Sequence, residues 1–242
     1  MRFYGKGIPG VSPEELSGRL IVVEGGDGAG RTTQIELLSN WLELQGHPAI
    51  KVEFKRSELV GEELESAMQG NQLCYYTLSL FYATDFVDQL ERTIIPALRA
   101  GFTVLADRYI YTLIARDIVR GADPEWVKGV YGTALVPHLV VYLKVNPKIL
   151  AQRSLQKDGS LDFWESGMDI QRSGDVYDCY LWYQNQIQHE FQKLQDEYGL
   201  CVINGNRTPE RVHNDVRRLV EPVLPGNSRQ NDKGESTVSS SS

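Results

Sequence analysis

Short aliphatic runs alternate along this chain with longer amphipathic stretches. The short runs, which predict strands buried on both faces, cover residues 20–24, 50–54, 103–106, 139–143 and 200–203. The amphipathic stretches, which predict helices, cover residues 33–44, 73–98, 110–119, 148–155, 175–198 and 209–220. Strands that alternate with helices in this way favour an α/β fold, with a five-stranded parallel sheet and helices on both faces.

The two ends of the chain depart from this pattern. Residues 1–18 are rich in glycine and proline and predict an extended N-terminal arm. Residues 225–242 carry almost no apolar side chains, and we expect them to be disordered. The part between them, residues 19–224, is expected to form one globular domain.

Composition narrows the classes of function. The chain has 242 residues, a net charge of −7 and a pI near 5.2, which argues against a nucleic-acid partner. No apolar run approaches the roughly 20 residues that a membrane-spanning helix needs. The N-terminus lacks the apolar core of a signal peptide, so a cytoplasmic protein is predicted. The cysteines and histidines show no metal-ligand spacing.

A glycine-rich segment, GGDGAGRT at residues 25–32, joins the first predicted strand to the first predicted helix. Glycines let backbone N–H groups turn toward one anion, and the helix N-terminus adds its positive end. The spacing matches the phosphate-binding pattern G-x-x-x-x-G-K-[ST], except that Arg31 replaces the lysine. The alternative is a turn that only packs strand against helix. We predict that the loop binds nucleotide phosphates through Gly25, Gly28, Ala29, Gly30, Arg31, Thr32 and Thr33.

Charged residues also follow the second and third predicted strands. In a parallel sheet, ligands bind beyond the carboxyl ends of the strands. Arg56 follows the second strand, whereas Asp107 and Arg108 follow the third. Thr32 and Asp107 are therefore candidates to hold Mg²⁺ or its waters, and Arg108 is a candidate to clamp a phosphate. The alternative for Asp107 and Arg108 is a surface ion pair.

These segments together resemble the thymidylate (dTMP) kinase family over about residues 19–222. The segments that carry the resemblance are LIVVEGGDGAGRTTQ (20–34), LFYATDFVDQLERTIIPALRAG (80–101), DRYIYTLIARD (107–117), PHLVVYLKVNPKILAQR (137–153) and VINGNRTPERVHNDV (202–216). The resemblance implies a P-loop NTPase three-layer sandwich with a mobile lid at about residues 155–170. It also implies phosphoryl transfer from Mg²⁺-ATP to dTMP, giving dTDP, by a homodimer.

The resemblance assigns roles on both sides of the transfer. On the acceptor side, Asp27 matches a contact to the sugar 3′-hydroxyl, Arg56 a phosphate ligand, Tyr82 a ring that stacks on thymine, and Thr112 a residue near the base. On the donor side, Asp107 matches the acid beside Mg²⁺ and Arg153 an arginine near the adenine. Arg31, Asp107, Arg108 and Asp27 are the predicted catalytic residues.

Several positions depart from the family. Phe86 replaces an arginine that reads the thymine, and Arg116 with Asp117 replaces a Tyr-Gln pair beside the sugar and base. The lid carries Phe163 at a position that resembles the arginine of a D-R-x-E motif. These changes leave two alternatives open: the same fold with another monophosphate acceptor, or a nucleotide-binding protein with weak catalysis, given Arg31 in the loop.

Overall fold

The computed structural model describes residues 1–55, 57–69, 73–170 and 174–226. Five strands form one parallel sheet in the order β2-β3-β1-β4-β5. The strands are β1 (Arg19–Glu24), β2 (Ala49–Glu53), β3 (Thr103–Asp107), β4 (Leu139–Lys144) and β5 (Cys201–Asn204). The predicted α/β class and the five-stranded parallel sheet are confirmed.

The helices follow the predicted alternation, with differences in the middle of the chain. They are α1 (Arg31–Leu44), α2 (Gly61–Gln69), α3 (Tyr75–Gln89), α4 (Ile95–Arg99), α5 (Ile110–Val119), α6 (Pro124–Val130), α7 (Pro147–Asp158), α8 (Val176–Tyr198) and α9 (Pro209–Val220). The stretch predicted as one helix at 73–98 is divided by a π-helical turn, Leu90–Ile94. Pro96 has no N–H and crowds the preceding turn, which explains the wider turn before it.

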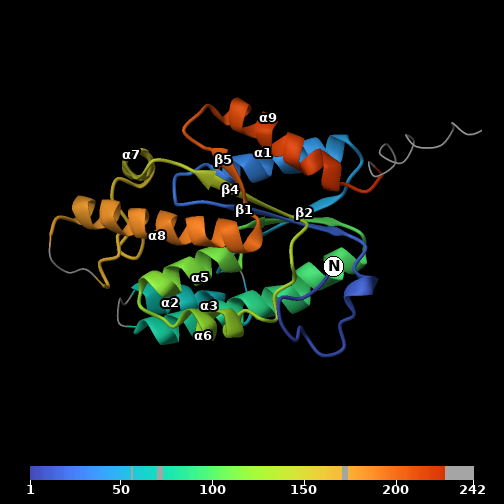
Figure 1. The fold of residues 1–242 in the computed structure, drawn as a ribbon, viewed down its shortest axis with the longest axis horizontal. Coiled ribbons are helices and arrows are strands. Elements are labelled where there is room, and N and C mark those ends of the chain that lie inside the picture. The colour runs from blue at the N-terminus through green and yellow to red at the C-terminus, as the bar shows by residue number, and fades with distance from the viewer. Residues whose placement is uncertain (56, 70–72, 171–173, 227–242) are drawn as a thin grey trace, which may run out of the picture.

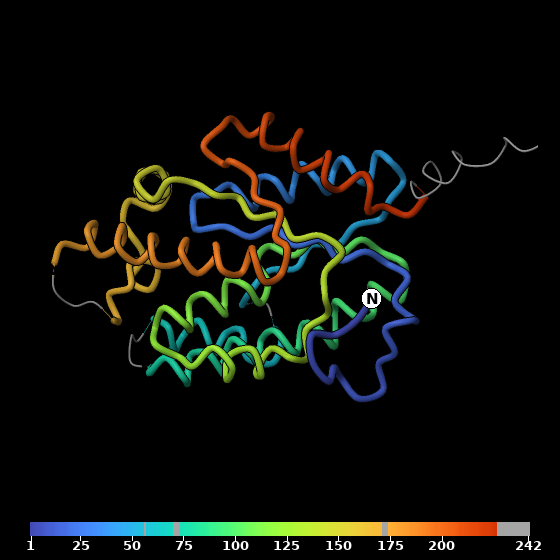
Figure 2. Tube along the Cα trace, in the orientation of Figure 1, coloured from blue at the N-terminus to red at the C-terminus, as the bar shows by residue number. Residues whose placement is uncertain are grey.

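Alternate side chains of the sheet enter two separate cores. Leu20 and Val22 of β1 pack with residues of α3, α4, α5 and α8, whereas Ile21 and Val23 pack with residues of α1 and α9. Figure 1 shows the resulting layers, with α1 and α9 on one side of the strands and α3, α5 and α8 on the other. Because β1, β2 and β3 are parallel neighbours, the loops that follow them leave the sheet at the same end. Figure 2 shows the path of the chain through these layers.

The N-terminal arm is part of the folded structure. Phe3 forms an antiparallel bridge with Leu135. The backbone N–H of Tyr4 donates to Ala134 O at 2.9 Å, and the Tyr4 hydroxyl lies 2.6 Å from that of Tyr111. The arm therefore covers one end of the core at α5. The disorder predicted for 225–242 falls mostly outside the described residues. In the described part of the chain, no helix is long and apolar enough to cross a membrane.

Candidate functional site

A cavity of about 870 Å³ opens at the carboxyl ends of the strands. Its walls come from the loop after β1, the end of β2, α3, the end of β3, α5, α7 and the segment after β5. Among the predicted site residues that line it are Asp27, Arg31, Thr32, Tyr82, Asp107, Arg108, Arg116 and Arg153. Residues distant in sequence thus meet at the sheet edge where the strand pattern predicted a ligand site.

The loop after β1 depends on glycine for its shape. Gly25, Gly28 and Gly30 have φ angles of 154°, 79° and 92°, a region that side chains disfavour. A Cβ on Gly25 would lie 3.0 Å from Leu143 O. Helix α1 begins at Arg31, directly after Gly30, so the unpaired N–H groups of its first turn lie at the loop. This strand, loop and helix form the context that a phosphate-binding loop requires.

Arg31 folds back onto the loop that carries it. Its Nε donates to Asp107 Oδ1 at 2.6 Å, and its Nη1 donates to the carbonyls of Gly25 at 2.5 Å and Gly26 at 2.6 Å. Its Nη2 lies 3.2 Å from Asp27 Oδ1. The planar guanidinium satisfies these acceptors in several directions at once, which a lysine ammonium on a single flexible stem would not reproduce. Arg31 is thus a structural tie between the loop and β3 as well as a cation in the cavity.

Thr32 and Asp107 meet beside that tie. The Thr32 hydroxyl donates to Asp107 Oδ2 at 2.9 Å, and both side chains line the cavity. A hydroxyl and a carboxylate are the hard oxygen donors that Mg²⁺ prefers, so the pair fits the ion. The described residues contain no group of three or more acidic, histidine or cysteine side chains arranged for a metal. The remaining ligands of a bound Mg²⁺ would therefore have to be phosphate oxygens and water.

Arg108 is aimed into the cavity by an unusual backbone. Its φ of 72° lies in the left-handed region, which costs a non-glycine residue about 1 kcal/mol. Its Nη2 lies 2.5 Å from Asp27 Oδ1 and 3.6 Å from Glu165 Oε1. Burial disfavours the Arg108 cation and lowers its pKa. The nearby carboxylates, of which Asp27 has the largest effect, outweigh the burial, so the pKa of Arg108 is raised. Burial also opposes the Asp27 anion, but Arg108 and Arg31 together hold the pKa of Asp27 well below its usual range.

Glu24 is a candidate positioning residue to which the sequence reasoning assigned no role. It ends β1, is 0% exposed, and accepts from Tyr109 N at 2.9 Å and from Thr112 N at 3.3 Å. The Thr112 hydroxyl donates to its other oxygen at 2.5 Å. Burial raises the pKa of Glu24 to about 7. Glu24 thus holds the turn that presents Arg108. The sequence signal that could have identified this role is an acidic residue at the end of an aliphatic strand.

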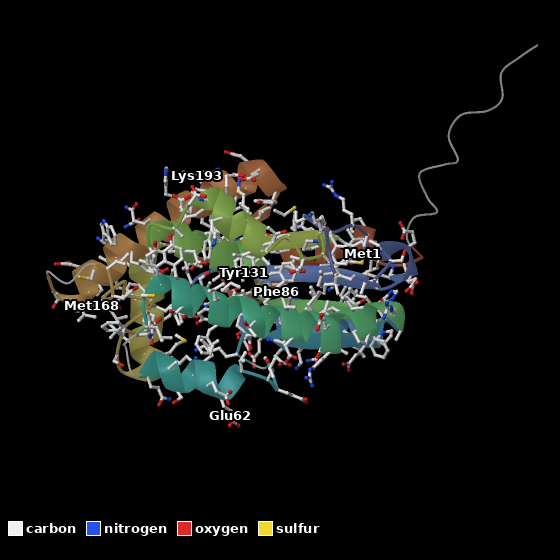
Figure 3. The ribbon with its side chains drawn as sticks, turned by 90° about the horizontal axis from the view of Figure 1, so that it is seen from below. Met1, Glu62, Phe86, Tyr131, Met168 and Lys193 are labelled. Carbon is white, nitrogen blue, oxygen red and sulfur yellow. The ribbon has the colours of Figure 1, made fainter. Side chains whose placement is uncertain are left out.

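Two predicted acceptor-side residues lie away from the cavity wall. Thr112 is buried and donates to Glu24, and its expected position near a base stays a prediction. Phe86 is 3% exposed, and its ring packs edge-on against Tyr109 at 5.2 Å and Tyr131 at 6.1 Å between centroids. Figure 3 places Phe86 and Tyr131 in the interior. Phe86 is not among the residues that line the cavity, because an apolar ring gains by leaving water for the core. The predicted loss of base recognition at this position stays a prediction.

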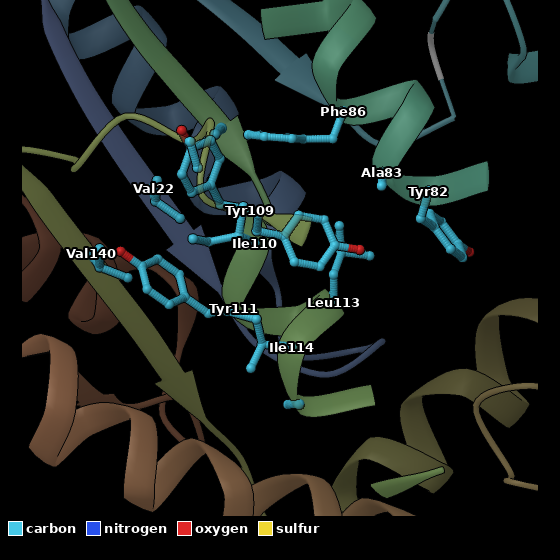
Figure 4. Packing of buried hydrophobic residues seen from close by; sticks show 14 of the residues in the cluster. Val22, Tyr82, Ala83, Phe86, Tyr109, Ile110, Tyr111, Leu113, Ile114 and Val140 are labelled. Atoms are coloured by element: carbon cyan, nitrogen blue, oxygen red, sulfur yellow. The ribbon is translucent and has the colours of Figure 1, made fainter. Parts of the chain in front are cut away.

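Tyr82, one turn before Phe86 on α3, is arranged differently. It lines the cavity, its ring centroid lies 6.0 Å from that of Phe54, and its hydroxyl donates to Met68 Sδ at 3.2 Å. Tyr82 and Phe86 belong to the same buried cluster and are 5% and 3% exposed, and Figure 4 shows their rings pointing to opposite sides of α3. Tyr82 and Phe54 therefore offer aromatic surface to a planar ligand.

Asp85 supports the loop after β2 from α3. It is buried, and its carboxylate accepts from Lys55 N at 3.0 Å and from Ser57 N at 2.9 Å. Arg56, between these two residues, lies outside the described residues. Asp85 was missed because nothing in the sequence connects an acid on a helix with a loop about thirty residues earlier.

The predicted lid begins in α7 and continues over the cavity. Helix α7 ends at Asp158, and Asp162 then accepts from the N–H groups of Trp164 and Glu165, both at 2.9 Å. The Trp164 ring nitrogen donates to Met68 O at 3.2 Å, which joins this segment to α2 across the cavity. The mobility of the lid stays a prediction. Arg172, just beyond the lid, lies outside the described residues.

Arg153 of α7 lies on the other side of the phosphate loop. Its Nη1 donates to Gly28 O at 3.0 Å and its Nη2 to Gly205 O at 3.4 Å, so it joins α7 to the loop and to the segment after β5. The side chain lines the same cavity as Tyr82 and Phe54. It is therefore placed for a ligand that extends past the phosphates.

Comparisons with known proteins identify the same family that the sequence segments resemble. The thymidylate kinase family model matches residues 23–216. A probable thymidylate kinase 2 from Saccharolobus solfataricus is 36% identical over 206 residues, which is 85% of this chain and 96% of that protein. A probable thymidylate kinase from Pyrococcus horikoshii is 28% identical over 87% of this chain and 100% of its own length. The thymidylate kinase of Fervidobacterium nodosum is 28% identical over 83% of this chain and 98% of its own length.

Proposed function

Because the chain belongs to the thymidylate kinase family, we propose that it transfers the γ-phosphoryl group of ATP to dTMP, giving ADP and dTDP. The observation that carries the proposal is the single cavity that joins the phosphate loop to Arg108 and to the Tyr82 ring. Two ligands that share this cavity would place a phosphate chain at the loop and, at Arg108 and Tyr82, a phosphate followed by a planar base.

On the donor side, the loop from Gly25 to Thr32 binds the ATP phosphates through its backbone N–H groups and through Arg31. Thr32 and Asp107 hold Mg²⁺, which when bound neutralises phosphate charge and orients the transferring group. Arg153 lies toward the adenine. The carbonyl contacts of Arg31 keep its charge close to the loop and support this role.

On the acceptor side, Tyr82 stacks on the base, and Arg56 and Arg108 hold the acceptor phosphate. Asp27 binds the sugar 3′-hydroxyl, which fits a carboxylate that stays ionised beside Arg108. In the transfer, an oxygen of the acceptor phosphate forms a bond to the γ-phosphorus. The bond to the bridging oxygen breaks, and ADP leaves. Catalysis consists of positioning and charge neutralisation, without a covalent enzyme intermediate.

The test is phosphoryl transfer by the purified protein. Mg²⁺-ATP is mixed separately with dTMP, dUMP, UMP, CMP, dCMP, AMP and GMP, and the diphosphate products are quantified. Turnover mainly with dTMP supports the proposal. Turnover mainly with another nucleotide supports the same chemistry with a different acceptor. ATP binding without turnover on any acceptor contradicts the proposal and supports a nucleotide-binding protein with weak catalysis.

A homodimer in the cytoplasm is also proposed, from the family resemblance. The surface of α3 supports the dimer, because Tyr76 and Leu80 are 45% and 51% exposed. The Tyr76 ring also packs edge-on against Trp126 of α6 at 5.0 Å. An apolar surface of this kind is typical of association sites. Light scattering coupled to size exclusion measures the mass, and a mass of one chain across micromolar concentrations contradicts the dimer.

A further inference from the structure

The acceptor half of the cavity already contains an anion from the chain itself. Glu165, in the predicted lid, is 8% exposed, and its Oε1 contacts Arg116 Nη2. The same oxygen lies 3.6 Å from Arg108 Nη2. One carboxylate thus bridges two guanidinium groups that come from α5 and from the turn after β3. All three side chains line the cavity.

The two arginines need such an anion. Burial, followed by the repulsion of Arg108, lowers the pKa of Arg116, so the pair is unfavourable unless a negative charge lies beside it. In the described part of the chain, Arg108 Nε is also buried without a hydrogen-bond partner. A bridging carboxylate therefore leaves donor capacity unused. A phosphate, with more oxygens and up to two charges, would use more of it.

Glu165 is held close to these arginines through its backbone and through its carboxylate, whose Oε2 accepts from Gln184 Nε2 at 3.3 Å. Gln184 Nε2 of α8 donates to Glu165 O at 2.9 Å, and Nη2 of Arg120, the residue directly after α5, donates to Trp164 O at 3.1 Å. Arg120 Nε also lies 2.8 Å from Asp169 Oδ2. A group tethered in this way competes with a free ligand at a high effective concentration. Its carboxylate would therefore fill the position between the arginines whenever no stronger anion is present.

We propose that Arg108 and Arg116 form a two-arginine subsite for the acceptor phosphate, and that Glu165 occupies this subsite until the acceptor displaces it. The proposal rests on the proposed function and adds a role for Arg116 and Glu165. Acceptor binding exchanges the bridge from carboxylate to phosphate, and the freed Glu165 releases one contact between the predicted lid and α5. Glu165 is thus a competing group rather than a catalytic residue.

Isothermal titration of the full chain with dTMP and with thymidine tests the exchange, because thymidine lacks the phosphate. Glu165→Gln should bind dTMP at least about threefold more tightly than the unmodified protein, because the competing charge is removed. Arg116→Gln should bind dTMP about tenfold more weakly, because one charge-assisted contact is lost. Both variants should bind thymidine within twofold of the unmodified protein. Asp196→Asn, a one-charge change on the exposed surface of α8, is the matched control and should leave both affinities unchanged.

Three results would overturn the exchange: weaker dTMP binding by Glu165→Gln, unchanged dTMP binding by Arg116→Gln, or equal effects on dTMP and thymidine. Circular dichroism checks that each variant is folded, and Arg116→Gln still decides the question if Glu165→Gln is not. The phosphoryl-transfer assay distinguishes a failure of the proposed function from a failure of the exchange. Absence of turnover on every acceptor refutes the proposed function, whereas normal turnover without the affinity changes refutes only the exchange. If another monophosphate is the acceptor, the titrations use that nucleotide and its nucleoside.

Discussion

Replacing Phe86 with arginine should destabilise the protein rather than improve acceptor binding. The family resemblance puts an arginine at this position, so the sequence alone favours the opposite result, a gain in dTMP turnover. The structure turns the ring away from the cavity and packs it against Tyr109 and Tyr131. A guanidinium placed there would have to remain in the core or force α3 to move.

The expected loss follows from the burial of Phe86. Removing a buried phenylalanine ring costs about 3–5 kcal/mol. The aliphatic stem of arginine recovers part of this, but a buried guanidinium without a partner adds a few kcal/mol. We therefore expect Phe86→Arg to lower the free energy of unfolding by at least about 4 kcal/mol. At ~2–4 °C per kcal/mol for a domain of this size, Tm should fall by at least about 8 °C.

Thermal unfolding followed by circular dichroism measures this loss, and isothermal titration with dTMP measures binding in parallel. Phe86→Leu is the matched control, because it keeps an apolar side chain and should cost only about 1–2 kcal/mol. A Phe86→Arg protein with a Tm within 2 °C of the unmodified protein and with tighter dTMP binding would refute the reasoning. Such a result would mean that position 86 reaches the acceptor base.

Three further changes test other parts of the site. Arg31→Lys should lower turnover at least about tenfold, because lysine cannot tie Asp107 to the loop carbonyls; a tenfold rise would show instead that arginine impairs the loop. Tyr82→Phe should leave the KM for dTMP within about threefold, since the hydroxyl bonds only Met68 in the described structure, whereas Tyr82→Ala should raise it at least tenfold. Glu24→Gln should flatten the pH dependence of stability. The folded pKa of about 7 exceeds the usual 4.5, so stability is greatest below pH 4.5 and is lost as pH rises through 7. The stability difference between the unmodified protein and Glu24→Gln, measured by urea unfolding, should change by about 2–3 kcal/mol between pH 5 and pH 8. The same difference at both pH values would contradict a protonated Glu24.

Local rules account for the parts of the fold that the sequence predicted well. The bounds of α5 and α9 agree with the prediction, and α9 begins at Pro209, a residue suited to a first helical turn. Helix α6 has the same kind of signal, because Asp123 caps it and Pro124 begins it, but at seven residues it is too short for a clear periodic pattern. The strand order depends on pairing between distant segments, so no local pattern specifies it.

The candidate site also contains some features that local sequence patterns predict and others that depend on tertiary packing. The phosphate loop was predictable because glycine spacing between a strand and a helix is a local signal. Phe86 was not, because the family correspondence gives its place on α3 but not the direction of its side chain. An apolar ring turns toward the core where an arginine would seek a partner. The Glu165 contact was also beyond reach, since it joins residues 49 positions apart through the packing of the lid segment on α5.

Three of the arginines that line the cavity are paired with carboxylates of the chain. Arg31 contacts Asp107 and Asp27, Arg108 contacts Asp27, and Arg116 contacts Glu165. Pairing of this kind lets three guanidinium groups share a partly buried cavity, because each isolated cation would be costly there. Under the proposed function, nucleotide phosphates would compete with these ion pairs, and affinity would depend on how much better phosphate is than carboxylate as a partner for the arginines. Phosphate is favoured by its higher charge and its additional oxygens, whereas a nucleoside without phosphate gains nothing from the exchange. Under the proposed function, the same arginines whose pairing stabilises the cavity would therefore select for the phosphate group of the ligand.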